Sequence, residues 1–448
     1  MNLKSQPELK AGILAEPVVR FTLLSEYHLP DKQIPVKGNF TACLKNGKIE
    51  LSDDTGIVTT APVIDLMPMS ENPAFEVSGV TIGISFHWEQ KEIQRFTGGI
   101  QLIPENGNVR LINRIKLEEY LESVIASEMS STASVALLKA HAVISRSWLL
   151  AQIEKRDTLK QKETRFPNPV SDNDTYIKWY DREDHDSFDV CADDHCQRYH
   201  GITKIRSPKA IQAVRETSGE ILQYDGKICD ARFSKCCGGI SENFENAWEP
   251  VHYPYLSMIV DSESGHPDFN TDLTAEVHAE KWIRNSPPAF CNTTDQTVLS
   301  QVLPDFDQST TDFYRWKKEY SQEELSALIL KKSGHDFGKI IRLEPVERGY
   351  SGRLVKLRIT GSKKILVVGK ELEIRKWLSV SHLYSSAFVV DYADVQDGIP
   401  DRIILTGAGW GHGVGLCQIG AAVMGEKGYL YDYILRHYFV GSELIKLY

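Results

Sequence analysis

The sequence predicts an α+β fold in which strand-rich N- and C-terminal regions surround a central helical core. Three observations support this: strand-type runs with turn signals occupy residues 17 to about 115, helical periodicity begins at residue 117, and strand signals return from 338 to 406. We find no regular alternation of strand and helix patterns, which a parallel sheet would require. The 448 residues, 42% of them hydrophobic, are enough for a sizeable core.

The N-terminal region, residues 1–115, is predicted to be β-rich. Short runs of β-branched and aromatic residues are separated by the turn signals Asn46-Gly47, Asp54-Thr-Gly56 and Asn106-Gly107. Such spacing indicates consecutive antiparallel strands.

The central core is assigned to residues 116–261 and begins with two helices. In the first, which we expect to stop at Ser130, apolar residues repeat at helical spacing: Leu117, Tyr120, Leu121, Val124 and Ile125. Ser134 is placed to cap a second helix that runs to about Glu154 and is apolar on most sides, which predicts a buried helix. Polar residues with Asp and Asn clusters then indicate an insertion at about 156–189.

The rest of the chain divides into a second insertion and a C-terminal region. Residues 262–337 are charged and helix-prone, with helices expected at Glu276–Arg284 and Gln322–Lys332. Residues 338–448 are predicted to be β-rich and to carry a glycine-rich loop, followed by a helix over Val414–Met424.

Charge and hydropathy exclude several classes of function. The chain has 51 basic and 61 acidic residues, and a net charge of −10 argues against non-specific binding to nucleic acid or to an anionic membrane. No run of about 18 apolar residues is present, so the sequence predicts no transmembrane segment. The first residues also lack the apolar run of a signal peptide, which favours a cytoplasmic location unless a leader has been removed.

Glu128 is a carboxylate on the apolar face of the first predicted helix. On a helical wheel it lies about 20° from Leu117 and about 40° from Val124, whereas Glu118, Glu119 and Glu122 are expected to face away. Loss of hydration there would favour the protonated form that general acid catalysis requires. The alternative is a glutamate at a helix end that turns into solvent.

Lys139 and Arg146 are the two cations in the otherwise apolar stretch of the second helix. They are seven residues apart and therefore share one face within about 20°. Buried cations need an anionic partner or an anionic ligand, and Glu128 is the nearest candidate if the two helices form an antiparallel pair. A structural ion pair without chemistry explains the pattern equally well.

His185, Cys191, His195 and Cys196 fall within twelve residues of one another. Two imidazoles and two thiolates suit tetrahedral zinc, although the spacing is not that of a standard zinc finger. A Cys191–Cys196 disulfide and free thiols are the alternatives. Adjacent Cys236 and Cys237 are interpreted as small packing residues beside Gly238-Gly239.

The glycine-rich segment Trp410-Gly-His-Gly-Val-Gly415 lacks the Lys-Ser/Thr of a phosphate-binding P-loop and the Gly-x-Gly-x-x-Gly spacing of a dinucleotide site. Its glycines are instead typical of a loop whose backbone approaches a substrate closely. Trp410 and His412 would then be displayed to a sugar ring. The alternative is a tight turn with Trp410 packed on the core.

Several motifs, taken in order, resemble the sporulation stage II protein D (SpoIID) family, which includes the amidase enhancer LytB. They are Leu117-Glu-Glu-Tyr-Leu121, Ala126-Ser-Glu-Met129, Ala136-Leu-Leu-Lys-Ala-His-Ala142 with Arg146, His195-Cys-Gln-Arg-Tyr199, Phe233-Ser with Gly238-Gly239, and Trp410-Gly-His-Gly-Val-Gly415 with Gln418. The chain departs from the family pattern at His141, where Gln is usual, at Cys236-Cys237, which replace a Ser-rich pair, and in its large insertions.

The resemblance implies a peptidoglycan lytic transglycosylase, which cleaves the MurNAc–GlcNAc bond of peptide-denuded glycan strands to 1,6-anhydro-MurNAc products. Glu128 matches the catalytic acid/base, and the substrate-binding candidates are Lys139, Arg146, Tyr199, Ser234, Trp410, His412 and Gln418. The alternative is a non-catalytic, glycan-binding amidase enhancer whose partner is a cell-wall amidase. Some relatives carry zinc in the region of His185, Cys191, His195 and Cys196, and the family resemblance implies a cell-envelope or periplasmic location, in conflict with the missing signal peptide.

Overall fold

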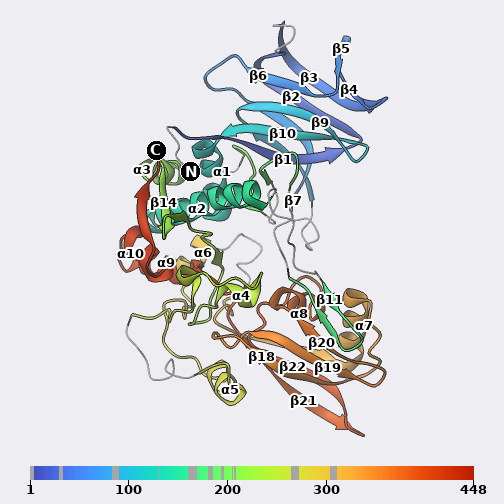
Figure 1. The fold of residues 1–448 in the computed structure, drawn as a ribbon, viewed down its shortest axis with the longest axis vertical. Helices are drawn as coiled ribbons and strands as arrows, with labels where there is room; N and C mark the ends of the chain where they lie inside the picture. Colours follow the sequence, from blue (N-terminus) through green and yellow to red (C-terminus); the bar gives the residue numbers. More distant parts are fainter. Residues whose placement is uncertain are drawn as a thin grey trace.

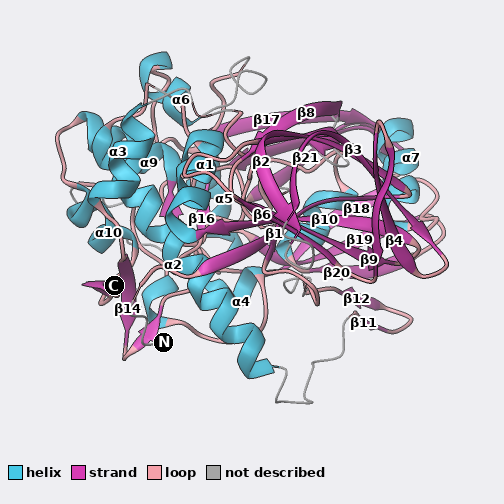
Figure 2. Cartoon of the chain, turned by 90° about the horizontal axis from the view of Figure 1, so that it is seen from above, coloured by secondary structure: helices cyan, strands magenta, loops and turns pink. Residues whose placement is uncertain are grey.

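The computed structural model describes residues 5–29, 34–82, 90–130, 132–159, 169–179, 185–192, 196–203, 205, 208–263, 272–302 and 310–448. These residues form strands β1 to β24 and helices α1 to α10, so the α+β prediction is confirmed. An N-terminal sheet lobe, a helical middle and a C-terminal sheet lobe follow one another along the long axis of the molecule (Figure 1). The strands gather on one side of the view from above and most helices on the other (Figure 2).

The N-terminal lobe is an eleven-stranded sheet with the order β13-β1-β10-β9-β6-β2-β3-β4-β5, to which β7 is added on β2 and β8 on β7. Its strands are β1 (Glu8–Glu16), β2 (Val18–Leu29), β3 (Ile34–Lys45), β4 (Lys48–Asp53), β5 (Gly56–Ala61), β6 (Ile64–Pro68), β7 (Phe75–Ile82), β8 (Gln90–Phe96), β9 (Gly99–Glu105), β10 (Asn108–Lys116) and β13 (Val190–Cys191). All these pairs are antiparallel except β13, which joins β1 in parallel. The edge of the sheet therefore fixes the segment before Cys196.

The helical middle is built around α2, which contacts α1, α3, α9 and α10. Its helices are α1 (Leu117–Glu128), α2 (Val135–Leu159), α3 (Pro208–Glu216), α4 (Phe244–Ala247), the short 3-10 helix η1 (Pro254–Leu256), α6 (Gln296–Val302), α9 (Gln418–Glu426) and α10 (Tyr431–Tyr438). Its strands are β14 (Glu220–Tyr224), β15 (Lys227–Ile228), β16 (Phe233–Ser234), β23 (Leu416–Cys417) and β24 (Glu443–Lys446). Residues 140 to 150 of α2 are all buried, as the predicted buried helix requires.

The C-terminal lobe joins a five-stranded sheet, β11-β12-β20-β19-β18, to the three-stranded sheet β17-β22-β21. Its elements are β11 (Val170–Ser171), β12 (Thr175–Ile177), α5 (Glu276–Arg284), β17 (Arg315–Ser321), α7 (Gln322–Ser333), β18 (Ile340–Arg348), β19 (Leu354–Gly361), β20 (Ile365–Gly369), α8 (Glu371–Trp377), β21 (Phe388–Gln396) and β22 (Ile399–Ala408). A hydrophobic core of its own includes Trp316, Leu357 and Trp377.

The two predicted insertions take part in this lobe. Within the insertion expected at 156–189, β11 pairs with β12 and β12 pairs with β20, and Figure 1 shows both strands far from α2. The helices expected at Glu276–Arg284 and Gln322–Lys332 are present as α5 and α7, but β17, between them, belongs to the sheet.

The predicted first residue of the helix over Val414–Met424 was wrong. Helix α9 begins at Gln418 rather than Val414, because Leu416 and Cys417 first pair with β16 as strand β23. The chain thus ends in the helical middle, with α10 and β24 after α9. Among the described helices, none combines the length and apolar character that crossing a membrane requires.

Candidate functional site

Glu128 is the last residue of α1 and is half-buried. The backbone N–H of Arg198 donates to its Oε1 atom at 3.2 Å. The chain then turns away, and Ser130 N–H donates to the carbonyl of Gln301 in α6 at 2.9 Å. The Glu128 carboxylate is therefore only partly exposed to solvent, and a backbone N–H orients one of its oxygens.

Arg146 does not reach Glu128, contrary to the ion pair considered from the sequence. Its guanidinium donates to both carboxylate oxygens of Glu118, at 3.0 and 2.6 Å, and to the carbonyl of Glu220 at 3.0 Å. Both Arg146 and Glu118 are buried. The expectation that Glu118 faces away was also wrong: it lies seven positions before Ile125, about 20° from that buried residue on the helical wheel.

Lys139 also binds a different carboxylate. Its Nζ atom lies 2.5 Å from Glu216 of α3 and 5.5 Å from the ring centroid of Tyr431 in α10. Neither Lys139 nor Arg146 is paired with Glu128. In this structure both link α2 to a neighbouring helix, and their role at a substrate stays a prediction.

Three of the four predicted zinc ligands converge. The ligand atoms of His185, Cys191 and Cys196 lie within 4.8 Å of one another, with 3.5 Å between Cys196 Sγ and His185 Nε2. The backbone N–H of Cys191 donates to Cys196 Sγ at 3.4 Å. His195 lies outside the described residues. One imidazole nitrogen and two sulfurs form a donor set that suits zinc, so the described part of the site fits that ion.

This local cluster lies beside α1. Burial raises the pKa of the Tyr120 phenol well above its usual value, with further contributions from Cys196, Cys191, Tyr199 and Glu128. The Tyr120 hydroxyl has no hydrogen-bond partner among the described residues. The cluster therefore lies near both the buried face of α1 and the segment whose Arg198 N–H binds Glu128.

Tyr199 and Gln418, expected at the substrate, are buried instead. Tyr199 is fully buried, and its hydroxyl donates to Asn113 Oδ1 at 2.6 Å. Gln418 begins α9, and its Nε2 lies 3.1 Å from Nε2 of His141 in α2. Both residues hold elements together, and their contact with a glycan stays a prediction.

Trp410 is half-exposed at the start of the glycine-rich segment. One ring face stacks on Phe313, with 4.6 Å between centroids and 10° between planes, and the edge of Tyr384 also contacts it. Trp410 pairs with Cys236 through two backbone hydrogen bonds. The segment also lies close to Ser234, because a Cβ atom on Gly411 would approach Ser234 Cβ to 3.2 Å; the buried Ser234 hydroxyl has no partner among the described residues.

His412 is half-exposed and is held by the main chain. Its Nδ1 accepts from Val414 N–H at 3.0 Å, and it bonds to the backbone of Phe233. Burial lowers the pKa of His412 well below its usual value, and Arg232 adds to this shift. The ring is therefore neutral at pH 7, and it fixes the loop beside Trp248, whose ring centroid is 4.5 Å away.

Two cations beside this segment were missed as site candidates. Arg232 lies over Trp248, 4.6 Å from its centroid, and Lys235 Nζ donates to the carbonyl of Val302 at 2.5 Å. Both flank Phe233-Ser234, which the family resemblance already identified. Their position next to that motif could have marked them as site candidates. Helix α6 also accepts a hydrogen bond from Ser130, which follows α1. Lys235 and Ser130 thus bind the neighbouring carbonyls of Val302 and Gln301.

Two parts of the chain resemble known families. Residues 105–224 match the family model described as Stage II sporulation protein, and residues 242–415 match a model described as Domain of unknown function (DUF8618). Together with the relatives below, these matches support a relationship of the chain to the stage II sporulation protein D and amidase enhancer proteins.

Three relatives illustrate the likeness. An uncharacterized protein of Brachyspira hyodysenteriae is 25% identical over 353 residues, which cover 78% of this chain and 72% of the relative. Stage II sporulation protein D of Bacillus amyloliquefaciens is 24% identical, with 74% and 75% covered. The amidase enhancer of Bacillus subtilis is 23% identical, over 72% of this chain and 40% of that protein.

Proposed function

We propose that the chain is a peptidoglycan lytic transglycosylase that cleaves the MurNAc–GlcNAc bond of peptide-denuded glycan strands. The observation that carries the proposal is Glu128: a half-buried carboxylate at the end of α1, with one oxygen oriented by the Arg198 N–H. The resemblance of residues 105–224, which include Glu128, to the Stage II sporulation protein model supports the same residue as the acid/base.

One carboxyl group is sufficient for this reaction. Protonated Glu128 gives its proton to the glycosidic oxygen as the bond from that oxygen to C1 of the muramic acid breaks. The oxygen of the C6 hydroxyl of the same sugar then bonds to C1, and its proton returns to the Glu128 carboxylate. The product is a 1,6-anhydro sugar, and no attacking water is consumed, in contrast to a hydrolase with two carboxylates.

The surface that would hold the glycan is the partly exposed face of the glycine-rich segment. Trp410 has one face covered by Phe313, so a sugar ring would pack on its other face or its edge. Trp248, packed on His412, extends this aromatic surface. Ser234, buried beneath Gly411, would support the loop.

Zinc is proposed at His185, Cys191 and Cys196, with His195 as the fourth ligand. Bound there, it would supply a structural crosslink, because the same segment leads directly to Arg198. Arg198 N–H would thereby be held against Glu128. The envelope of the cell, where peptidoglycan is found, is the proposed location.

Glu128→Gln tests the catalytic proposal. The glutamine amide cannot donate the proton. The release of 1,6-anhydro products from denuded glycan strands, which mass spectrometry measures, is therefore expected to fall by about 10²- to 10⁴-fold. Glu122→Gln is the matched control, since Glu122 lies on the same helix and is bonded to Arg215. Wild-type rates in Glu128→Gln would reject the assignment.

The second candidate is a glycan-binding amidase enhancer, favoured by the relative of that name and by half-exposed Trp410. Two variants distinguish this function from that of the enzyme. Stimulation of a cell-wall amidase would survive Glu128→Gln and fall with Trp410→Ala, and neither wild type nor variant would release anhydro products.

A further inference from the structure

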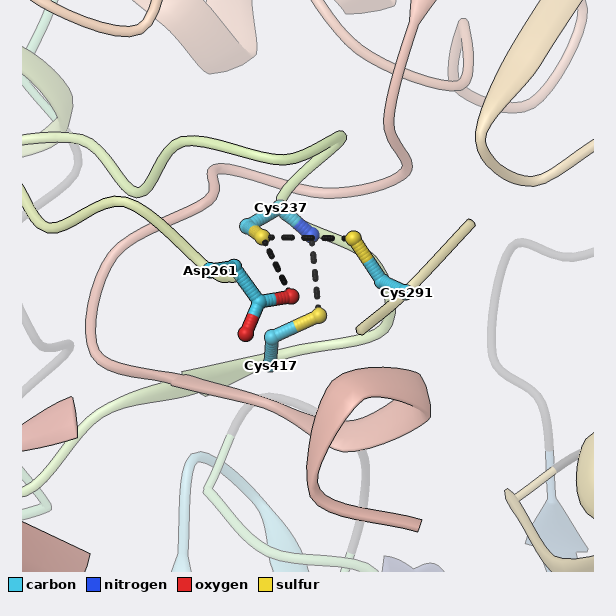
Figure 3. A group of neighbouring side chains, drawn as sticks. All are labelled: Cys237, Asp261, Cys291 and Cys417. Carbon is cyan, nitrogen blue, oxygen red and sulfur yellow. Dashed lines mark hydrogen bonds between the residues drawn. The ribbon is translucent and has the colours of Figure 1, made fainter. Parts of the chain in front are cut away.

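A second group of sulfur and oxygen ligands lies inside the protein, away from the segment 185–196. The ligand atoms of Cys237, Asp261, Cys291 and Cys417 all lie within 4.8 Å of one another, and all four residues are buried. Figure 3 shows their side chains pointing toward a common centre from four separate stretches of chain. We call these four residues the buried cluster.

The spacing of the buried cluster suits a tetrahedral ion. With Zn–S bonds of about 2.3 Å, two sulfurs on one zinc are about 3.8 Å apart. Cys237 Sγ lies 3.5 Å from Cys291 Sγ and 3.3 Å from Asp261 Oδ2. A disulfide needs about 2.05 Å between sulfurs, so the geometry is that of separate thiols gathered around a point.

Hydrogen bonds orient the ligands as in a metal–thiolate site. Backbone N–H groups of Cys237 and Gly239 donate to the sulfurs of Cys417 and Cys237, at 3.2 and 3.4 Å. The Tyr438 hydroxyl donates to Asp261 Oδ1 at 2.7 Å, which leaves Oδ2 directed at the sulfurs. Hydrogen bonds of this kind fix the orientation of the residues that bind a metal and tune its properties.

Two guanidinium groups provide the compensating charge. Arg353 Nη1 donates to the Cys237 carbonyl at 3.1 Å, and Arg315 Nη1 donates to the Gly238 carbonyl at 3.0 Å. Three thiolates and one carboxylate carry two more negative charges than a dication, and these two cations match that excess. Buried charges require such pairing.

We propose that Cys237, Cys291, Cys417 and Asp261 form a closed, structural site for a thiophilic divalent cation, with zinc as the ion whose ligand preferences match. All four positions of a tetrahedral ion are filled by protein, so no place is left for a substrate or water. Soft thiolates select such a metal over Mg²⁺ or Ca²⁺.

The ion would link the parts of the chain that support the glycine-rich segment. Cys417 is the N-cap residue of α9, directly after that segment, and Cys236, next to Cys237, pairs with Trp410. Asp261 and Cys291 lie in the connections before and after α5. Metal binding would thus hold Trp410 and His412 in place without taking part in chemistry, whether or not the chain cleaves glycan.

The test counts zinc per chain in the full-length protein purified under reducing conditions. Cys196→Ser first removes a ligand of the local cluster, and one zinc per chain is expected to remain. Adding Cys291→Ser should abolish that zinc. Adding Cys229→Ser instead should leave it, because Cys229 is equally buried and is outside the buried cluster.

X-ray absorption on the Cys196→Ser chain keeps the proposal testable if the double variant does not fold. Three sulfurs at about 2.3 Å and one oxygen at about 2.0 to 2.2 Å are expected around zinc. A Cys196→Ser chain without zinc, a zinc content unchanged by Cys291→Ser, or a Cys237–Cys291 disulfide found by mass spectrometry would each overturn it. The loss of one zinc ion out of two on Cys196→Ser concerns only the local cluster.

Discussion

Arg146 and Lys139 project from the same side of α2, two turns apart, yet they lie in different surroundings. The Arg146 side chain has no exposed surface and forms two hydrogen bonds with Glu118, which is 11% exposed. Lys139 is 22% exposed and meets a single oxygen of Glu216, which is 42% exposed. One is a buried bidentate pair and the other a surface contact.

The difference follows from the position of each residue along the helix pair. Arg146 lies about as far beyond the connection between α1 and α2 as Glu118 lies before it, so the two meet across the antiparallel helices. There β14 and Tyr448 also cover the pair, and the Tyr448 hydroxyl bonds to Glu118. Lys139 lies nearer the surface, where α3 and α10 leave it partly open. A shared helical face thus does not predict a shared environment.

Arg146→Met should have the largest effect. It leaves the Glu118 carboxylate buried without its cation, and breaking a buried pair in this way costs about 3 to 5 kcal/mol of the free energy of unfolding. Chemical denaturation followed by circular dichroism measures this loss.

The double variant Arg146→Met/Glu118→Gln separates charge from packing. It removes both charges and keeps an acceptor for Tyr448, so it should be more stable than Arg146→Met alone. If the double variant is less stable than the single one, the cost comes from lost packing and hydrogen bonds, and the electrostatic interpretation is wrong.

His141 sharpens the comparison because it is another basic side chain of α2, buried with no carboxylate in hydrogen-bond contact among the described residues. Burial lowers its pKa to about 3, and Lys235 adds to the shift. Ser145 and Gln418 lie at its two ring nitrogens, and Phe233 packs on its edge. The ring is therefore neutral in the folded protein.

The sign of the pH effect follows from this lowered pKa. Between pH 6.5 and 3 the unfolded chain binds a proton at His141 that the folded chain does not, so stability is complete above pH 6.5 and is lost as the pH falls. By pH 5 the loss at this one group is about 1 to 2 kcal/mol. In His141→Gln, denaturation midpoints should fall less between pH 7.5 and 5 than in wild type. An equal fall in both proteins would show that His141 is protonated in the folded state or does not couple to stability.

The elements that the sequence predicted correctly are those whose signal is local. Helices α5 and α7 and the turn-punctuated N-terminal strands have periodic patterns within a few residues. The candidate ligands His185, Cys191 and Cys196 were found because they lie in one short stretch. The burial of Glu118 was predicted wrongly although its signal is also local, because its seven-residue spacing to Ile125 places it on the buried face of α1.

The remaining features depend on long-range packing. Cys237 and Cys417 are 180 residues apart and meet only through the pairing of β16 with β23. Tyr199 lies in a motif that resembles the stage II sporulation protein D family, but only the fold shows that its hydroxyl is bonded to Asn113 in the core. A motif match identifies a position that matters and does not distinguish a substrate contact from a structural one.

Lys139→Met should have the smallest effect and so marks the other end of the comparison. The Lys139 ammonium and Gln212 lower the pKa of the Glu216 carboxyl, so the pair stabilises the fold at neutral pH and ceases to do so as the pH falls through that lowered value. A partly exposed pair contributes little and is screened by salt, and methionine retains the packing against Tyr431. Denaturation midpoints of variant and wild type should therefore agree within error at neutral pH, and any small difference should vanish in high salt. A loss comparable to that of Arg146→Met would mean that exposure does not distinguish the two cations, and that α2 is fixed as strongly at its Lys139 end as at its Arg146 end.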